Sequence, residues 1–151
     1  MYQKILAPLD GSEFSECALA HVSAIATGCQ VPDVTLLSII EPVPQMTYVY
    51  ASDVLDKAAP KMQAETENYL GKIADRLKGE GLTVQTVVLN GRAADEILSY
   101  ISQNPVDLII MSTHGRAGVS RWVMGSVTDR VLRHSTVPVL TVSPAGCRVS
   151  L

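Results

Sequence analysis

Residues 4–27 read KILAPLDGSEFSECALAHVSAIAT, and this stretch combines the two patterns that decide the fold. Its beginning, Lys4–Leu9, is an apolar run that predicts a buried strand. From about Glu13 to Thr27, apolar side chains recur at steps of three and four residues, which predicts a helix with one apolar face. The three residues Asp10-Gly11-Ser12 between them are typical of a turn. A strand that leads directly into a helix is the unit of α/β domains.

The same alternation continues along the chain. Further strands are predicted at Val34–Ile40, Thr83–Leu89, Leu108–Met111 and Pro138–Val142, and further helices over Ala93–Ser102, over Ser126–Arg133 and in the segment that stops at Gly79-Glu80-Gly81. Most of these strands are apolar throughout, which is typical of strands covered on both faces of a parallel sheet. We predict one doubly wound α/β domain over residues 1–143, with a five-stranded parallel sheet and helices on both faces. Residues 144–151 are predicted to be a C-terminal tail.

Prolines indicate where the helix that stops at Gly79 begins. Pro42 and Pro44 predict a loop over Glu41–Ser52. Proline is tolerated in the first turn of a helix and disfavoured in its middle. Pro60 therefore predicts that this helix begins close to it.

Composition excludes several classes of protein. The chain has 151 residues, of which 47% are hydrophobic and 18% are charged, so a disordered chain is excluded. A formal net charge of −3 argues against a general nucleic-acid binder. Apolar runs such as Leu108–Met111 are far shorter than the roughly 18 residues that span a membrane. Because the first residues also lack the long apolar stretch of a signal peptide, we predict a cytoplasmic protein with no membrane or nucleic-acid partner.

The three cysteines, Cys17, Cys29 and Cys147, have no Cys-x-x-Cys spacing. The sequence therefore predicts neither a zinc site nor a disulfide framework. Cys17 and Cys29 fall on or near the first helix, where we expect inert, buried thiols.

Charge is distributed unevenly. Residues 1–110 carry 7 basic and 14 acidic side chains, whereas residues 111–151 carry five arginines and only Asp129 as an acid. A locally basic segment in an acidic protein favours an anionic ligand there. Alternatively, these arginines lie on a solvated helix face and pair with acids.

The junctions between strands and helices are the candidate ligand sites, since open α/β sheets bind ligands at the carboxyl ends of their strands. The junction after Met111 carries Gly115 and Gly118, whose backbone can approach a phosphate, and Gly125-Ser126, which opens a helix. His114, Arg116 and Arg121 would add positive charge. As an alternative, Ser126 and Asp129 form a capping box that serves only their own helix, and Asp129 pairs with Arg133.

Asp10, after the first strand, also has two interpretations. It could bind ribose hydroxyls or a nucleotide-borne metal, or it could cap the first helix together with Glu13. The chain has no P-loop, no Gly-x-Gly-x-x-Gly after the first strand and no Gly-x-Ser-x-Gly, so three common catalytic or cofactor motifs are excluded.

Together these residues resemble the universal stress protein family, in its single-domain, adenine-nucleotide-binding form. The opening Lys4–Ser12 and the stretch Asp107–Val142 are similar to the family's two ends. The family's nucleotide motif is Gly, two residues, Gly, nine residues, Gly, then Ser or Thr. Here it falls on Ser112, Gly115 and Gly125-Ser126, with Ser112 in place of the first glycine.

The resemblance implies ATP or AMP as ligand, alone or with Mg²⁺. Adenine and ribose would be bordered by Pro8 and Asp10, with Leu9 between them, and the base flanked by Ile39 and Met111. The residues implied to hold ribose and phosphates are Ser112, His114, Gly115, Arg116, Gly125, Ser126 and Val127, to which the loop analysis adds Gly118.

The resemblance also implies a homodimer that pairs through the last strand. Val137–Val142 carries no charge, and an uncovered edge strand favours such pairing.

We therefore predict a stress-response nucleotide-binding protein that acts through its dimer or partner contacts. The rival hypothesis is a slow ATPase or nucleotide transferase on the same fold. It would need a positioned base and metal-binding carboxylates, for which Asp10 is the only candidate. A third hypothesis is an interaction protein that no longer binds a ligand because Ser112 replaces the first glycine of the motif.

Overall fold

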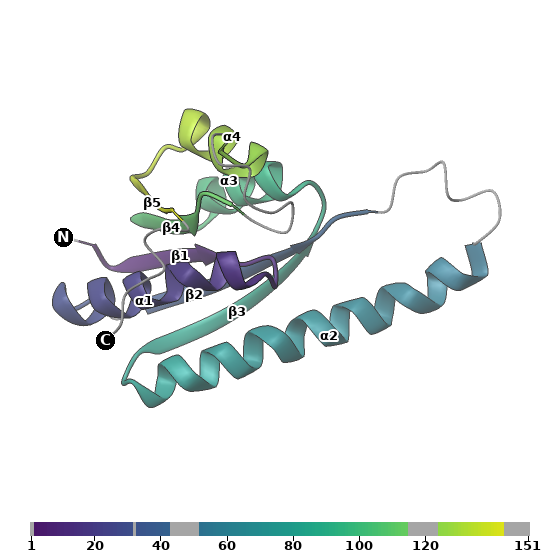
Figure 1. Ribbon diagram of the computed structural model, residues 1–151, viewed down its shortest axis with the longest axis horizontal. Coiled ribbons are helices and arrows are strands. Elements are labelled where there is room, and N and C mark those ends of the chain that lie inside the picture. The colour runs from purple at the N-terminus through teal and green to yellow at the C-terminus, as the bar shows by residue number, and fades with distance from the viewer. Residues whose placement is uncertain (1, 32, 43–51, 115–123, 144–151) are drawn as a thin grey trace.

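The computed structural model describes residues 2–31, 33–42, 52–114 and 124–143, with the backbone alone described for residues 52–58. Strands and helices alternate along the chain (Figure 1). The strands are β1 (Lys4–Pro8), β2 (Asp33–Ile40), β3 (Thr83–Asn90), β4 (Leu108–Ser112) and β5 (Val139–Val142). The helices are α1 (Glu13–Gly28), α2 (Ser52–Gly79), α3 (Ala93–Gln103) and α4 (Ser126–His134).

The five strands form one parallel sheet in the order β3-β2-β1-β4-β5, which confirms the predicted fold class. The chain builds outward from β1 to β3 and then returns to the other side of β1 with β4. The strand order therefore reverses between β1 and β4. In an open parallel sheet, the carboxyl ends of the strands beside such a reversal form a ready-made crevice.

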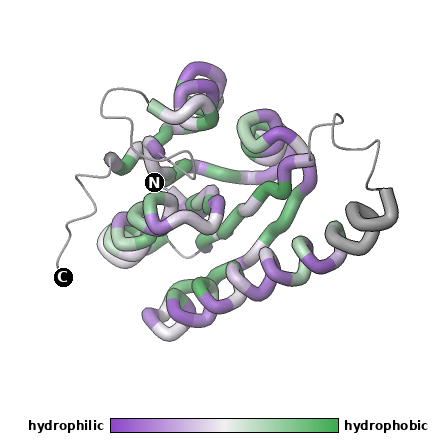
Figure 2. The backbone as a smooth tube through the Cα atoms, turned by 45° about the vertical axis from the view of Figure 1, so that its right-hand side comes forward, coloured by the Kyte–Doolittle hydropathy of each residue, from purple (hydrophilic) through white to green (hydrophobic). Residues whose placement is uncertain are grey.

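Two hydrophobic layers cover the sheet. On one face, β-strand residues such as Ile5 and Leu36 pack with Leu19 of α1 and Leu70 of α2. On the other face, residues such as Leu6 pack against α3 and α4. Figure 2 shows the most hydrophobic segments in the central strands. Successive residues of a strand point to opposite faces, so apolar runs here satisfy both layers.

The start of α2 differs from the prediction. The helix begins at Ser52, and Pro60 lies inside it rather than in its first turn. Proline removes one backbone hydrogen bond of a helix, and this cost is local. The segment around Pro60 contains Lys57, Ala58, Ala59 and Lys61, which are good helix formers. The lost bond is thus insufficient to end the helix, and α2 extends along β3 and past it (Figure 1).

The cysteine prediction is also corrected. Cys17 is disulfide-bonded, and Cys29 is free and exposed rather than buried. No helix in the part of the chain that the structure describes is long and apolar enough to cross a membrane.

Candidate nucleotide-binding cleft

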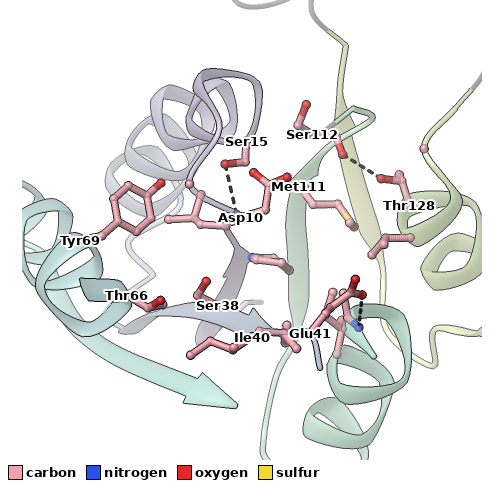
Figure 3. Close-up of a pocket in the computed structure, with 18 of the residues that line it drawn as sticks. Asp10, Ser15, Ser38, Ile40, Glu41, Thr66, Tyr69, Met111, Ser112 and Thr128 are labelled. Carbon is pink, nitrogen blue, oxygen red and sulfur yellow. Dashed lines mark hydrogen bonds between the residues drawn. The ribbon is translucent and has the colours of Figure 1, made fainter. Parts of the chain in front are cut away.

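A cleft of about 770 Å³ lies at the carboxyl ends of β1, β2 and β4, where the strand order reverses. It reaches from α2 to the beginning of α4 (Figure 3). Its size is in the range of small-molecule and cofactor sites, which is about 300–1,000 Å³.

Ten of the residues singled out from the sequence line this one cleft. They are Pro8, Leu9, Asp10, Ile39, Met111, Ser112, His114, Gly125, Ser126 and Val127. Gly115, Arg116, Gly118 and Arg121 lie outside the described residues. Segments as far apart in the sequence as Pro8 and Val127 are thus brought together by the parallel sheet.

The turn after β1 is held by Asp10. Its Oδ1 atom accepts hydrogen bonds from the backbone N–H of Ser12 at 2.9 Å and from the Ser12 hydroxyl at 2.6 Å. Ser12, not Asp10, is the N-cap of α1, because its Oγ accepts from the Ser15 N–H at 3.1 Å. The interpretation of Asp10 as the cap itself is therefore wrong: Asp10 orients the cap and also lines the cleft. Gly11 has a φ of +81°, which a side chain would strain.

The junction between β4 and α4 is fixed by buried hydrogen bonds. The hydroxyl of Thr128 donates to the carbonyl oxygen of Ser112 at 2.9 Å. The backbone N–H of His114 donates to the Ser112 Oγ at 3.3 Å, and the His114 Nδ1 lies 2.8 Å from the Thr113 Oγ1. The bond from Thr128 holds the end of β4 against the first turn of α4, and the two contacts of His114 order the residues that follow β4.

Helix α4 begins differently from the capping-box alternative. Gly125 is its N-cap, Ser126 is its first helical residue, and the cap makes no side-chain hydrogen bond. The Gly125 N–H donates to the Thr113 carbonyl at 2.8 Å, and a Cβ atom on Gly125 would lie 3.1 Å from that oxygen. The capping box is therefore absent, whereas the predicted Asp129–Arg133 ion pair is confirmed at 2.9 Å. The first residues of α4 thus face the cleft with N–H groups that no side chain caps.

Helix α2 contributes a wall of the cleft that the sequence did not predict. Met62, Glu65, Thr66 and Tyr69 line the cleft from that helix. Their spacing of one helical turn was visible, but it equally describes a helix face against the sheet, and no sequence signal placed it over the carboxyl ends of β1 and β2. The remaining lining residues that were not predicted are Gly11, Ser15, Ser38, Ile40, Glu41, Ala93, Ile97 and Thr128.

Two of these unpredicted residues have structural partners. The Glu41 Oε1 accepts a 3.0 Å hydrogen bond from the Ala93 N–H and so caps α3, whose N-cap residue Arg92 makes no such bond. The Tyr69 hydroxyl donates to the Glu16 Oε1 at 3.1 Å. Burial raises the pKa of the Tyr69 phenol well above its usual range, and the Glu16 carboxylate raises it further. Tyr69 is therefore protonated at neutral pH.

The cleft combines a few carboxylates with apolar walls. Among the described residues, no group of three or more His, Cys, Asp and Glu side chains could hold a metal ion. Of the described lining residues, Asp10, Glu41 and Glu65 carry carboxylates, and Glu41 already caps α3. The apolar side chains of Ile39 and Met111 line the same cleft as the uncapped N-terminus of α4. The apolar side chains suit a flat apolar group, and the helix N-terminus suits an anion joined to it.

Known proteins resemble this chain both in sequence and in fold. Residues 1–143 match the sequence profile of the Universal stress protein family. "Universal stress protein MJ0577" of Methanocaldococcus jannaschii is 32% identical over 94% of this chain and 95% of its own. A solved structure of MJ0577 superposes with a TM-score of 0.83 at 33% identity, covering 95% of this chain and 96% of that one.

Two solved structures contain adenine nucleotides. A universal stress protein in complex with cAMP has a TM-score of 0.68 at 22% identity and covers 94% of this chain and 97% of that one. An Arabidopsis thaliana family protein with AMP bound has a TM-score of 0.66 at 16% identity, covering 93% and 91%. At these identities the likeness is one of fold.

Proposed function

The chain belongs to the universal stress protein family, and on that premise we propose that it is a stress-response module that binds ATP or AMP in the cleft between α2 and α4. The observation that carries the proposal is the convergence of ten residues, chosen from the sequence, on one cleft at the strand-order reversal. Two family members of the same fold were solved with adenine nucleotides.

In this proposal, the base lies between Ile39 and Met111. Both side chains belong to the layer on the α3–α4 face of the sheet, and Met111 is buried. Ribose then lies over the end of β1, beside Pro8 and Asp10. A carboxylate is a suitable acceptor for ribose hydroxyls, and Asp10 is held in place by its bonds to Ser12.

The phosphates would lie at the start of α4, near Gly125, Ser126 and Val127. Helix N-termini present free N–H donors and a partial positive charge, which favour a phosphate. The motif spacing assigns the rest of the phosphate contacts to Gly115, Arg116 and Gly118. His114, whose ring is oriented by Thr113, would stand at the same end of the cleft.

We further propose that occupancy changes contacts of a homodimer formed through β5. The alternative function, a slow ATPase or nucleotide transferase, requires a general base and a metal near the phosphates. Of the carboxylates that line the described cleft, Asp10 is assigned to the ribose, Glu41 caps α3 and Glu65 lies on α2, and this favours binding over turnover.

The first experiment asks whether the protein carries a nucleotide. Freshly purified protein is denatured and the released small molecules are identified by mass spectrometry, and the apo protein is then titrated with AMP and ATP in a calorimeter. Saturable binding of an adenine nucleotide is expected. If neither nucleotide binds to the folded protein, the proposal is wrong.

A matched pair of variants locates the site. Asp10→Asn keeps the side-chain oxygen that accepts from Ser12 but loses the charge, so α1 should remain capped. We expect it to weaken AMP binding by roughly tenfold, the effect of losing a charged hydrogen-bond acceptor. Asp33→Asn makes the same charge change at the amino end of β2, away from the cleft, and should bind like the wild type. Equal effects of both variants would contradict the assignment.

A further inference from the structure

The cleft has two sides that are lined by different chemistry. Figure 3 shows Met111, Ser112 and Thr128 on one side and Ser38, Thr66 and Tyr69 on the other. The second side, which we call the α2 lobe, is formed by Ser38, Glu65, Thr66 and Tyr69, with Asp10 at its border. A nucleotide seated between Ile39 and Met111 with its phosphates at α4 uses the first side and leaves the α2 lobe for another group.

Ser38 gives the strongest indication that the α2 lobe holds a ligand. In β2 it shares the face of Val34 and Leu36, which point toward α1 and α2. It is only 5% exposed, and its hydroxyl makes no hydrogen bond to the described residues. Figure 3 shows this hydroxyl directed into the cleft, on the side of Thr66 and Tyr69. The hydroxyl oxygen is open to the cleft, and its lone pairs are available to a ligand that donates hydrogen bonds.

The other polar atoms of the lobe are acceptors. The Thr66 hydroxyl hydrogen is used in a 2.8 Å bond to the Met62 carbonyl, and the Tyr69 hydrogen is used in the bond to Glu16. Each of these oxygens therefore offers lone pairs but no hydrogen. A ligand that completes this set must itself carry several donors.

The lobe is also negatively charged. Glu65 and Asp10 line it, Glu16 lies behind Tyr69, and none of the described residues that line the cleft is Lys or Arg. The Nζ atom of Lys61 lies 3.8 Å from the Glu65 Oε1. That pair has exposed side chains, so it is weak and a ligand could displace it.

We propose that the α2 lobe binds the primary ammonium group of a small organic amine. An ammonium group has three donors and one positive charge. The three donors match the hydroxyl oxygens of Ser38, Thr66 and Tyr69, and the positive charge matches the carboxylate of Glu65. A metal ion fits less well, because the described residues provide no group of three His, Cys, Asp or Glu ligands. This site goes beyond nucleotide binding and does not depend on it.

The test uses the full-length protein and n-butylammonium chloride as the probe, at constant ionic strength. Binding is followed by the NMR chemical shifts of the backbone amides of Ser38, Thr66 and Tyr69. We expect saturable shifts at these amides with the probe, and none with 1-butanol or with tetramethylammonium, which has no N–H donor. Absence of saturable shifts, or equal shifts with tetramethylammonium, would overturn the proposal.

Two variants in α2 separate a specific site from general attraction of cations. Glu65→Gln should weaken binding of the probe about two- to fivefold, as expected for a partly exposed ion pair. Glu67→Gln makes the same charge change two residues away, outside the cleft, and should leave the affinity unchanged. If both variants weaken binding equally, the probe is held only by the charge of the helix and the site does not exist.

Ser38→Ala tests the buried hydroxyl. It should weaken binding of the probe roughly tenfold, as expected for the loss of a hydrogen bond to a charged group. AMP binding, measured by calorimetry on the same variant, should not change, so failure of the amine site is distinguishable from failure of the nucleotide site. Unchanged affinity of Ser38→Ala for the probe would contradict the assignment.

Discussion

The Thr128 hydroxyl donates a 2.9 Å hydrogen bond to the backbone carbonyl of Ser112, and both residues are buried. This bond joins the first turn of α4 to the end of β4. It therefore sets the distance between the helix N-terminus, proposed to bind phosphate, and the strand end, proposed to contact ribose.

Replacing Thr128 by valine should test this connection. Valine has nearly the shape of threonine but leaves the Ser112 carbonyl without its partner, so we expect a loss of about 1–3 kcal/mol in the free energy of unfolding. We also expect weaker AMP binding, because α4 is less well fixed to β4. Urea denaturation and calorimetry measure the two effects. Thr128→Ser keeps the hydroxyl and is the control: if it loses as much AMP affinity as Thr128→Val, the hydrogen bond is not the cause.

Ser112→Gly restores the glycine that the family motif has at this position. The Ser112 Oγ accepts from the His114 N–H, so its removal should loosen the turn that positions His114. We expect AMP affinity to fall by about 0.5–1.5 kcal/mol, the worth of a neutral hydrogen bond. Calorimetry of the folded variant decides the matter. Tighter binding would mean instead that the Ser112 Cβ obstructs the ligand.

Thr141→Pro should disrupt the proposed homodimer without breaking the sheet. β5 is the edge strand beside β4, as predicted. The Pro138 carbonyl accepts a hydrogen bond from Ile109 of β4, and the Val142 carbonyl accepts one from Thr113, the residue after β4. Because backbone groups of a strand alternate in direction, the Thr141 N–H faces the open edge. Proline removes this donor and leaves the bonds to β4 intact.

Light scattering should therefore show the wild type as a dimer and Thr141→Pro as a shift toward monomer. Thr141→Val retains the N–H and should remain dimeric. A wild type that is monomeric at micromolar concentration, or a folded Thr141→Pro dimer, would rule out pairing through β5.

The hydrogen bonds of Asp107 predict that the stability of the protein depends on pH. Its Oδ2 accepts from the backbone N–H groups of Gln3 at 2.7 Å and Lys4 at 2.9 Å, and these two bonds, the one from Gln3 first, lower the pKa of the carboxyl. A lowered folded-state pKa gives stability that is present above the unfolded pKa of about 3.9 and is lost as the pH falls through the folded value.

Urea unfolding of Asp107→Asn should show a smaller loss of stability than the wild type as the pH falls below about 4. Parallel pH profiles of wild type and Asp107→Asn would show that the contact at the start of β1 has no effect on stability.

The sequence by itself determined the α/β fold and most element boundaries. Apolar runs such as Leu108–Met111 can be buried only if both faces of a sheet are covered, and breakers such as Gly79 and Pro105 mark the ends of helices. Local chemistry dictates these features, so they can be predicted without knowing how the elements pack. The strand-to-helix junctions followed from the same patterns, whereas Pro8, Ile39, Met111 and Val127 were named only through the resemblance to a known family.

Tertiary structure alone decided the rest. Whether Gly125 or Ser126 caps α4 depends on the bond from the Gly125 N–H to the Thr113 carbonyl, which exists only once β4 and α4 are in place. Helix α2 starts at Ser52 because the helix remains stable despite the backbone hydrogen bond that Pro60 removes. Whether the rest of the helix compensates for that loss cannot be read from the local sequence. Ser38 and Tyr69 come together because the right-handed crossovers stack α2 on the β2 face, and hydrophobic burial over the whole sheet, rather than any local motif, supplies the free energy for that arrangement.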